Sequence, residues 1–190
     1  MRLFAAVLPP EPVVAALAAE VTALRGLPGA EALRWTEPTG WHFTLAFYGE
    51  VADDVVPDLS ARLARAAGRT APFALAVRGG GQFGHGRALW AGADGDLAEL
   101  RRLADRAEAA GRRAGAGTGE HRRYRPHLTL ARARTELDAG PYLEALDRFA
   151  GPRWTVTDLA LVRSNPPVSG VPGERPRYEV AGRWVLGGGG

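Results

Sequence analysis

The sequence predicts an α+β protein made by an internal duplication, with two mainly antiparallel sheets, helices on the outside and a central cleft between two similar lobes. Segments typical of strands and helices follow one another in the same order twice along the chain. The tetrapeptide His-x-Thr-Leu occurs once in each stretch, at His42 and at His127. The 190 residues, 46% hydrophobic and 24% charged, have the composition of an ordinary globular domain.

The first stretch begins with Arg2–Leu8, a short apolar run that ends at two prolines and is typical of a buried strand. Glu11–Leu24 carries valines and leucines at helical spacing, which predicts a helix. Trp41–Tyr48 is rich in aromatic and β-branched residues and ends at a glycine, so we expect a strand. Asp53–Ala67 again places apolar residues at helical spacing and predicts a second helix.

Two further strands are expected before the second stretch. Phe73–Val77 alternates apolar residues, and Ala88–Ala91 is a short apolar run. The glycines of Gly79–Gly86 predict a turn between these strands.

The second stretch repeats this order. Asp96–Arg113 has the strongest helical periodicity in the chain, with leucines and alanines on one face. His127–Ala131 predicts a strand, Leu137–Phe149 a helix, Trp154–Val162 a strand and Tyr178–Leu186 the last strand. Loops are predicted at Gly111–Gly119 and Asn165–Pro176.

Residues 1–186 are expected to form one bilobal domain, followed by a flexible glycine tail over 187–190. No stretch resembles a linker between independent domains. No apolar run approaches the length of a membrane helix, and the first ten residues break too early for a secretory signal. We therefore expect a cytoplasmic protein with no membrane partner, and a monomer.

The composition excludes several classes of site. The chain has no cysteine, which excludes disulfides, thiolate zinc sites, iron–sulfur clusters and cysteine nucleophiles. All 24 basic residues are arginines, so lysine Schiff-base chemistry and a P-loop lysine are also excluded. A net charge of +3 only mildly favours polyanionic partners. No cofactor is expected.

The doubled motif carries the chemistry. Because side chains alternate along a strand, His42 and Thr44 share one face, and Phe47 falls with the apolar residues on the other. The same alternation places His127 and Thr129 on one face. Two imidazoles and two hydroxyls that meet across one cleft are suited to two proton transfers around a bound oxyanion.

Two other interpretations of the motif are open. Each histidine and threonine could satisfy the polar needs of a buried strand, although the duplication argues against this for both copies. A metal bound by His42 and His127 lacks a carboxylate at a suitable place, so we expect no metal site. His85 and His121 lie in predicted loops without a threonine partner and are expected on the surface.

These residues also resemble a known family. The opening Arg2–Ala6, the block Trp41–Glu50, the pair Leu89 and Trp90, and the run Arg125–Arg132 are similar to the RNA 2′,3′-cyclic phosphodiesterases of the ThpR, or LigT-like, family of two-histidine (2H) phosphoesterases. The resemblance spans Arg2 to Leu186. It implies metal-independent hydrolysis of a terminal 2′,3′-cyclic phosphate to a 2′-phosphate and, in some members, reversible 2′-5′ joining of RNA.

The resemblance also implies roles for the motif residues. His42 would be the proton donor to the departing 3′ oxygen, and His127 the acceptor that activates water. Thr44 and Thr129 would hold the phosphate oxygens. The residues themselves indicate an acid and a base on opposite sides of phosphorus and leave open which histidine is which.

Two arginines are candidates to bind the phosphate. Arg125 has the strand parity of His127 and is expected to face the cleft. Arg132 has core-side parity and would reach phosphate only if the strand ends or bulges there, yet the resemblance favours it. Phe47 or Trp41 could stack on the terminal base. A loop cluster that could follow an RNA backbone comprises Arg112, Arg113, Arg122, Arg123 and Arg125.

The expected partners are RNA or oligonucleotide ends with a 2′,3′-cyclic phosphate and small cyclic nucleotides. Family members often carry a basic residue at the position of Ala46, a difference that concerns RNA affinity more than catalysis. Two alternatives stay open: a 2H phosphoesterase that acts on another cyclic or 2′-5′ ester, and a non-catalytic RNA-binding module.

Overall fold

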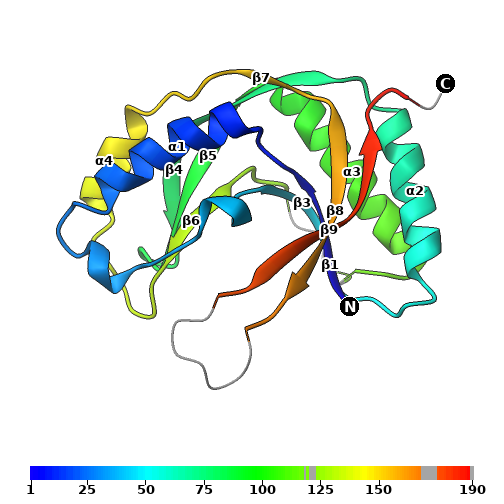
Figure 1. Cartoon of the computed structure of the whole chain (residues 1–190), viewed down its shortest axis with the longest axis horizontal. Coiled ribbons are helices and arrows are strands. Elements are labelled where there is room, and N and C mark those ends of the chain that lie inside the picture. The colour runs from blue at the N-terminus through cyan, green and yellow to red at the C-terminus, as the bar shows by residue number, and fades with distance from the viewer. Residues whose placement is uncertain (118, 120–122, 168–174, 189–190) are drawn as a thin grey trace.

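A computed structural model describes residues 1–117, 119, 123–167 and 175–188 (Figure 1). His121, Arg122 and most of the predicted loop Asn165–Pro176 lie outside the described residues, as does the end of the glycine tail. Within the described part of the chain, no helix combines the length and apolarity needed to cross a bilayer.

Two antiparallel sheets form the protein, which confirms the predicted α+β class. The four-stranded sheet A has the order β3-β1-β8-β9, and the five-stranded sheet B has the order β2-β6-β5-β4-β7. The strands of sheet A are β1 (Arg2–Val7), β3 (Phe43–Glu50), β8 (Asp158–Asn165) and β9 (Arg177–Val185). Those of sheet B are β2 (Arg34–Trp35), β4 (Phe73–Phe83), β5 (Ala88–Gly95), β6 (Leu128–Arg132) and β7 (Trp154–Val156).

Each sheet has two helices on its outer face. In Figure 1, α1 and α4 lie against sheet B, and α2 and α3 lie against sheet A. Their bounds are α1 (Glu11–Leu24), α2 (Val56–Gly68), α3 (Leu97–Ala114) and α4 (Gly140–Asp147), with 3-10 turns η1 (Ala30–Ala32) and η2 (Pro38–Gly40). Helix α3 buries leucines and alanines at the predicted spacing and ends at Gly115, whose φ of 77° suits glycine.

The predicted duplication takes an interlocked form. The first repeat, β1-α1-β3-α2-β4, places β1 and β3 in sheet A but its last strand, β4, in sheet B. The second repeat, β5-α3-β6-α4-β8, places β5 and β6 in sheet B and its last strand, β8, in sheet A. The two sheets therefore contain equivalent strand orders, β3-β1-β8 in sheet A and β6-β5-β4 in sheet B. Each repeat supplies the third strand of the sheet that the other repeat begins.

Two predictions about single elements were wrong. Trp154–Val162 is not one strand: the chain leaves β7 at Val156, crosses between the sheets, and resumes as β8 at Asp158. The sequence does not reveal this crossing, because both β7 and β8 have the apolar residues typical of a buried strand.

The predicted turn Gly79–Gly86 is also mostly strand, since β4 continues to Phe83. A Cβ atom on Gly81 would lie 2.2 Å from Cζ2 of Trp90. The glycine therefore allows the indole of Trp90 to lie directly over β4, and it does not mark a turn.

Strand β1 is buried on both faces, which explains its continuous apolar sequence. Leu3, Ala5 and Val7 belong to the main core beneath the helices. Phe4 and Ala6 point the other way and form a small separate cluster, completed by Ala160 and Val162. This second face of sheet A carries the first motif.

Candidate active site

The two motif histidines are held in the same way. Each stands directly before its strand, β3 or β6. Nδ1 of His42 lies 2.7 Å from the carbonyl oxygen of Gly40, and Nδ1 of His127 lies 2.8 Å from that of Arg125. Because a carbonyl oxygen only accepts, Nδ1 of each ring must carry the proton. Nε2 of each ring is left to exchange a proton with a substrate.

Aromatic side chains surround both histidines. The ring centroid of His42 lies 4.6 Å from that of Phe4 and 5.5 Å from that of Tyr178. The ring centroid of His127 lies 5.1 Å from that of Phe83 and 6.1 Å from that of Trp90. These neighbours come from strands distant in the sequence, so sequence reasoning missed them. Together with the Nδ1 hydrogen bonds, they hold each imidazole in one orientation.

The electrostatics link the two motifs. Burial lowers the pKa of His42, with a further lowering from the positive charge of His127, whereas the hydrogen bond to Gly40 acts in the opposite direction. Mutual repulsion means that the two imidazoles lie within electrostatic reach of each other. A bound phosphate would supply the opposite charge and raise this pKa.

A register shift places Phe47 beside the first motif. Thr44 lies opposite Ala6 of β1, Leu45 has no opposite residue, and Phe47 lies opposite Phe4. Residues that lie opposite each other in an antiparallel pair share a face. Phe47 therefore lies on the same face of sheet A as Phe4, whose ring contacts that of His42, and the side chain of Phe47 is 63% exposed. Strict alternation placed Phe47 on the core side, which is wrong because of this bulge.

The second motif has the same irregularity. Thr129 lies opposite Trp90 of β5, Leu130 has no opposite residue, and Arg132 lies opposite Ala88. Arg132 thus shares the face of Thr129, because the strand bulges before it, which is the condition expected for Arg132 to leave the core side. Phe47 and Arg132 are equivalent in the duplication: each stands three residues after the motif threonine and is exposed.

The site contains a second arginine that the sequence did not reveal. Arg34 of β2 lies directly opposite Arg132, on the same face of sheet B, and both are exposed. Among the described residues, neither guanidinium forms an ion pair. Strand β2 has only two residues, too few to give a periodic pattern. Like charges at opposite positions cost stability unless an anion lies between them.

The other candidates are placed as follows. Arg125 is exposed before β6, with its carbonyl oxygen bound to His127. Trp41 is buried in the core at 3% exposure, so of the two aromatic side chains considered for stacking on a base only Phe47 remains. His85 is exposed in the turn between β4 and β5, as predicted. The described residues contain no group of three or more side chains suited to hold a metal ion.

An apolar row extends from the first motif across sheet A. Phe47, Phe4, Val162 and Val180 lie opposite one another in successive strands. The two ends of the row, Phe47 and Val180, are exposed at 63% and 50%. Tyr178, at 37%, adds its ring beside His42. The surface next to His42 therefore offers aromatic and aliphatic contacts, whereas the face of sheet B that carries Thr129 also presents the guanidinium groups of Arg132 and Arg34.

Comparisons with known proteins agree with this architecture. A curated relative from Thermus thermophilus, named RNA 2′,3′-cyclic phosphodiesterase, is 35% identical over 195 residues that cover 99% of this chain and 91% of the relative. A solved structure from the same organism superposes with a TM-score of 0.78 at 33% identity, over 99% of both chains. E. coli LigT in complex with 3′-AMP superposes with a TM-score of 0.72 at 29% identity, over 97% of this chain and 96% of that one.

A family model described as the 2′-5′ RNA ligase superfamily matches residues 10–166, a span that holds both motifs. The LigT-like resemblance noted from the sequence is confirmed by this match and by the relatives. The chain belongs to the 2′-5′ RNA ligase superfamily.

Proposed function

We propose that this protein is a metal-independent RNA 2′,3′-cyclic phosphodiesterase that opens a terminal cyclic phosphate to a 2′-phosphate. The observation that carries the proposal is the matched pair of histidines. Each donates Nδ1–H to the carbonyl two residues earlier, which frees Nε2, and each stands at the start of a strand in a different sheet. The name of the Thermus thermophilus relative supports the same reaction.

The reaction needs one proton acceptor and one proton donor. Nε2 of His127 takes a proton from water as the water oxygen attacks phosphorus. The bond from phosphorus to the 3′ oxygen breaks on the opposite side, and Nε2 of His42 gives its proton to that oxygen. The products are a 2′-phosphate and a 3′-hydroxyl, and solvent returns the proton from His127 to His42.

The assignment of donor and acceptor depends on the charge of the bound substrate. In the empty site, burial lowers the pKa of His42, which by itself favours this ring as an acceptor. A cyclic phosphate carries one negative charge, which raises that pKa when it binds and prepares His42 to donate. The threonines, Thr44 and Thr129, donate their hydroxyls to the non-bridging oxygens, where negative charge accumulates in the transition state.

Other side chains hold the substrate. Arg132, with Arg34 beside it, supplies guanidinium groups to the phosphate, and Arg125 is the further candidate. The exposed ring of Phe47 stacks on the terminal base. A 5′-hydroxyl that takes the place of water would give a 2′-5′ linkage by the same chemistry, so we include reversible ligation as a second activity, in keeping with the family name. We further propose a cytoplasmic monomer that acts on RNA ends and on small cyclic nucleotides.

The test is hydrolysis of a short RNA that ends in a 2′,3′-cyclic phosphate, in excess chelator, with separation of 2′- and 3′-phosphate products. Exclusive 2′-phosphate supports the proposal. A 3′-phosphate product contradicts the assigned leaving oxygen, and loss of turnover in chelator contradicts metal independence. No turnover on any cyclic or 2′-5′ ester favours the non-catalytic RNA-binding alternative.

Variants of the histidines test the mechanism itself. His42→Ala and His127→Ala should each lower kcat by about 10² to 10⁴, since each removes one general acid or base. His85→Ala, in the exposed turn, is the control and should keep full activity. Near-normal turnover in both motif variants would contradict the proposal that His42 and His127 act as general acid and base.

A further inference from the structure

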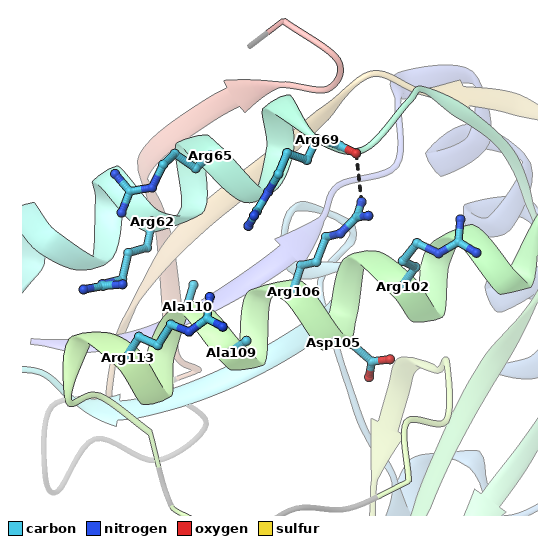
Figure 2. Close-up of a pocket in the computed structure, with 9 residues that line it drawn as sticks. All are labelled: Arg62, Arg65, Arg69, Arg102, Asp105, Arg106, Ala109, Ala110 and Arg113. Atoms are coloured by element: carbon cyan, nitrogen blue, oxygen red, sulfur yellow. Dashed lines mark hydrogen bonds between the residues drawn. The ribbon is translucent and has the colours of Figure 1, made fainter. Parts of the chain in front are cut away.

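We propose that the groove between α2 and α3 is a second anion site that binds the phosphate backbone of RNA, away from the reacting end. The inference rests on the proposed function for the identity of the polyanion. The groove has a volume of about 380 Å³ and lies on the outer side of sheet A (Figure 2). It is lined by Arg62, Arg65, Arg69, Arg102, Asp105, Arg106, Ala109, Ala110 and Arg113.

The charge of this groove is strongly one-sided. Six of its nine lining residues are arginines and one is an aspartate. Figure 2 shows the carboxylate of Asp105 pointing away from α2. By contrast, the whole chain has a net charge of only +3. The concentration of guanidinium groups here is therefore a local feature of two helix faces.

One arginine of the groove is held in place by hydrogen bonds to the end of α2. Arg106 donates to the carbonyl oxygen of Arg69 at 3.0 Å and to the hydroxyl of Thr70 at 2.7 Å. Thr70 is itself buried and donates to the carbonyl oxygen of Ala66. Arg106 thus joins α3 to the end of α2 and fixes the spacing of the two arginine rows.

The other guanidinium groups of the groove differ in their partners. Arg62 pairs with Asp58, and Arg102 pairs with Glu99. Among the described residues, Arg65, Arg69 and Arg113 form no ion pair or side-chain hydrogen bond, and all three are exposed. Neighbouring like charges repel one another, and a bound phosphate removes that repulsion with bidentate hydrogen bonds.

The spacing of the arginines suits a chain of phosphates better than a single ion. At a rise of 1.5 Å per residue, the rows extend over about 10 Å from Arg62 to Arg69 and about 16 Å from Arg102 to Arg113. The small side chains of Ala109 and Ala110 leave the floor open. The lining lacks the large aromatic or aliphatic anchors that a protein partner or a membrane surface would need.

The experiment measures binding of a single-stranded RNA with a free 3′-hydroxyl, which cannot react, by fluorescence anisotropy over a range of salt. The variant is the triple change Arg65→Ala, Arg69→Ala and Arg113→Ala. The matched control removes the same charge at Arg101, Arg148 and Arg153, which are exposed outside the groove. Hydrolysis of a 2′,3′-cyclic mononucleotide is measured in parallel, because so small a substrate does not reach the groove.

We expect the groove variant to lose at least tenfold in RNA affinity, and the slope of log K against log salt to fall by about 2, since three contacts to a single strand contribute about 0.7 each. Mononucleotide turnover should be unchanged. RNA affinity equal to that of the control variant overturns the proposal, whatever the activity. Inorganic polyphosphate is used as a second probe, because its phosphates could bind the same arginines. Tight binding of polyphosphate without binding of RNA would contradict RNA as the ligand.

A second variant guards against misfolding. Lysine at the same three positions keeps the charge but not the bidentate guanidinium fork, so this variant should bind RNA more weakly than the unchanged protein and more tightly than the alanine variant. If the alanine variant loses mononucleotide turnover as well, the lysine variant decides: an active lysine variant that binds RNA more tightly than the alanine variant supports the site, and one that binds no better than the alanine variant overturns the proposal. Inactivity of the unchanged protein on cyclic phosphates would contradict the proposed function but would leave the groove measurement intact.

Discussion

Replacement of Gly81 by alanine should damage catalysis without any change to a motif residue. The added Cβ would lie 2.2 Å from Cζ2 of Trp90, whereas carbon atoms in contact lie about 3.5 to 4.0 Å apart. The indole must therefore move by roughly 1.5 Å. Trp90 lies 6.1 Å from His127 between ring centroids, so this displacement reaches the proposed acceptor. A misplacement of about 1 Å at a reacting group costs about 10² in rate.

The assay is kcat and KM for a 2′,3′-cyclic mononucleotide, with the melting temperature measured in parallel. Overpacking should lower stability by about 1 to 3 kcal/mol, a loss that a folded domain tolerates. The double variant Gly81→Ala with Trp90→Leu removes the ring that the new methyl group strikes, and it should recover part of kcat. Gly26→Ala, where the nearest atom is 3.4 Å away, is the control. A folded Gly81→Ala protein with normal kcat would refute the reasoning.

Three further predictions concern charge and base contacts. Burial lowers the pKa of His42, so this imidazole binds a proton more readily in the unfolded chain than in the folded protein. The free energy of unfolding should therefore decrease as the pH falls through about 6.5. Melting curves at several pH values should show a smaller decrease for His42→Gln, and an equal decrease would contradict the burial of the ring. Phe47→Ala should raise KM severalfold with little change in kcat, and an unchanged KM for every base would exclude stacking. Arg132→Ala should lower kcat/KM by at least tenfold and Arg34→Ala by less; strictly additive effects in the double variant would show that the two guanidinium groups do not share a phosphate.

Much of the fold follows from local sequence. The periodicity of Glu11–Leu24 predicts helix α1 with its observed bounds, because a proline pair starts it and apolar residues recur on one face. The doubled His-x-Thr-Leu motif identifies the histidines and threonines, since a repeated polar pattern on two strands has few other causes. These features depend on residues that are close together in the chain, so a single sequence is enough to predict them.

The remaining features depend on contacts between distant segments. The bulges at Leu45 and Leu130 reverse the faces of Phe47 and Arg132, and nothing in the local alternation marks them. The glycine Gly81 signals a turn by itself, yet it is needed because Trp90 of another strand lies over it. The groove between α2 and α3 likewise arises from two helices that are each ordinary amphipathic segments.

The exchange of strands between the sheets makes each repeat depend on the other. Without β8, sheet A would end at β1, whose buried backbone edge would be open to pairing with any other strand. One repeat made alone could regain a third strand from a second copy, as in a domain-swapped dimer. We therefore propose that residues 1–186 fold as one unit. Fusion of two such copies into one chain would give an enzyme in which the acid and the base can never dissociate into separate subunits.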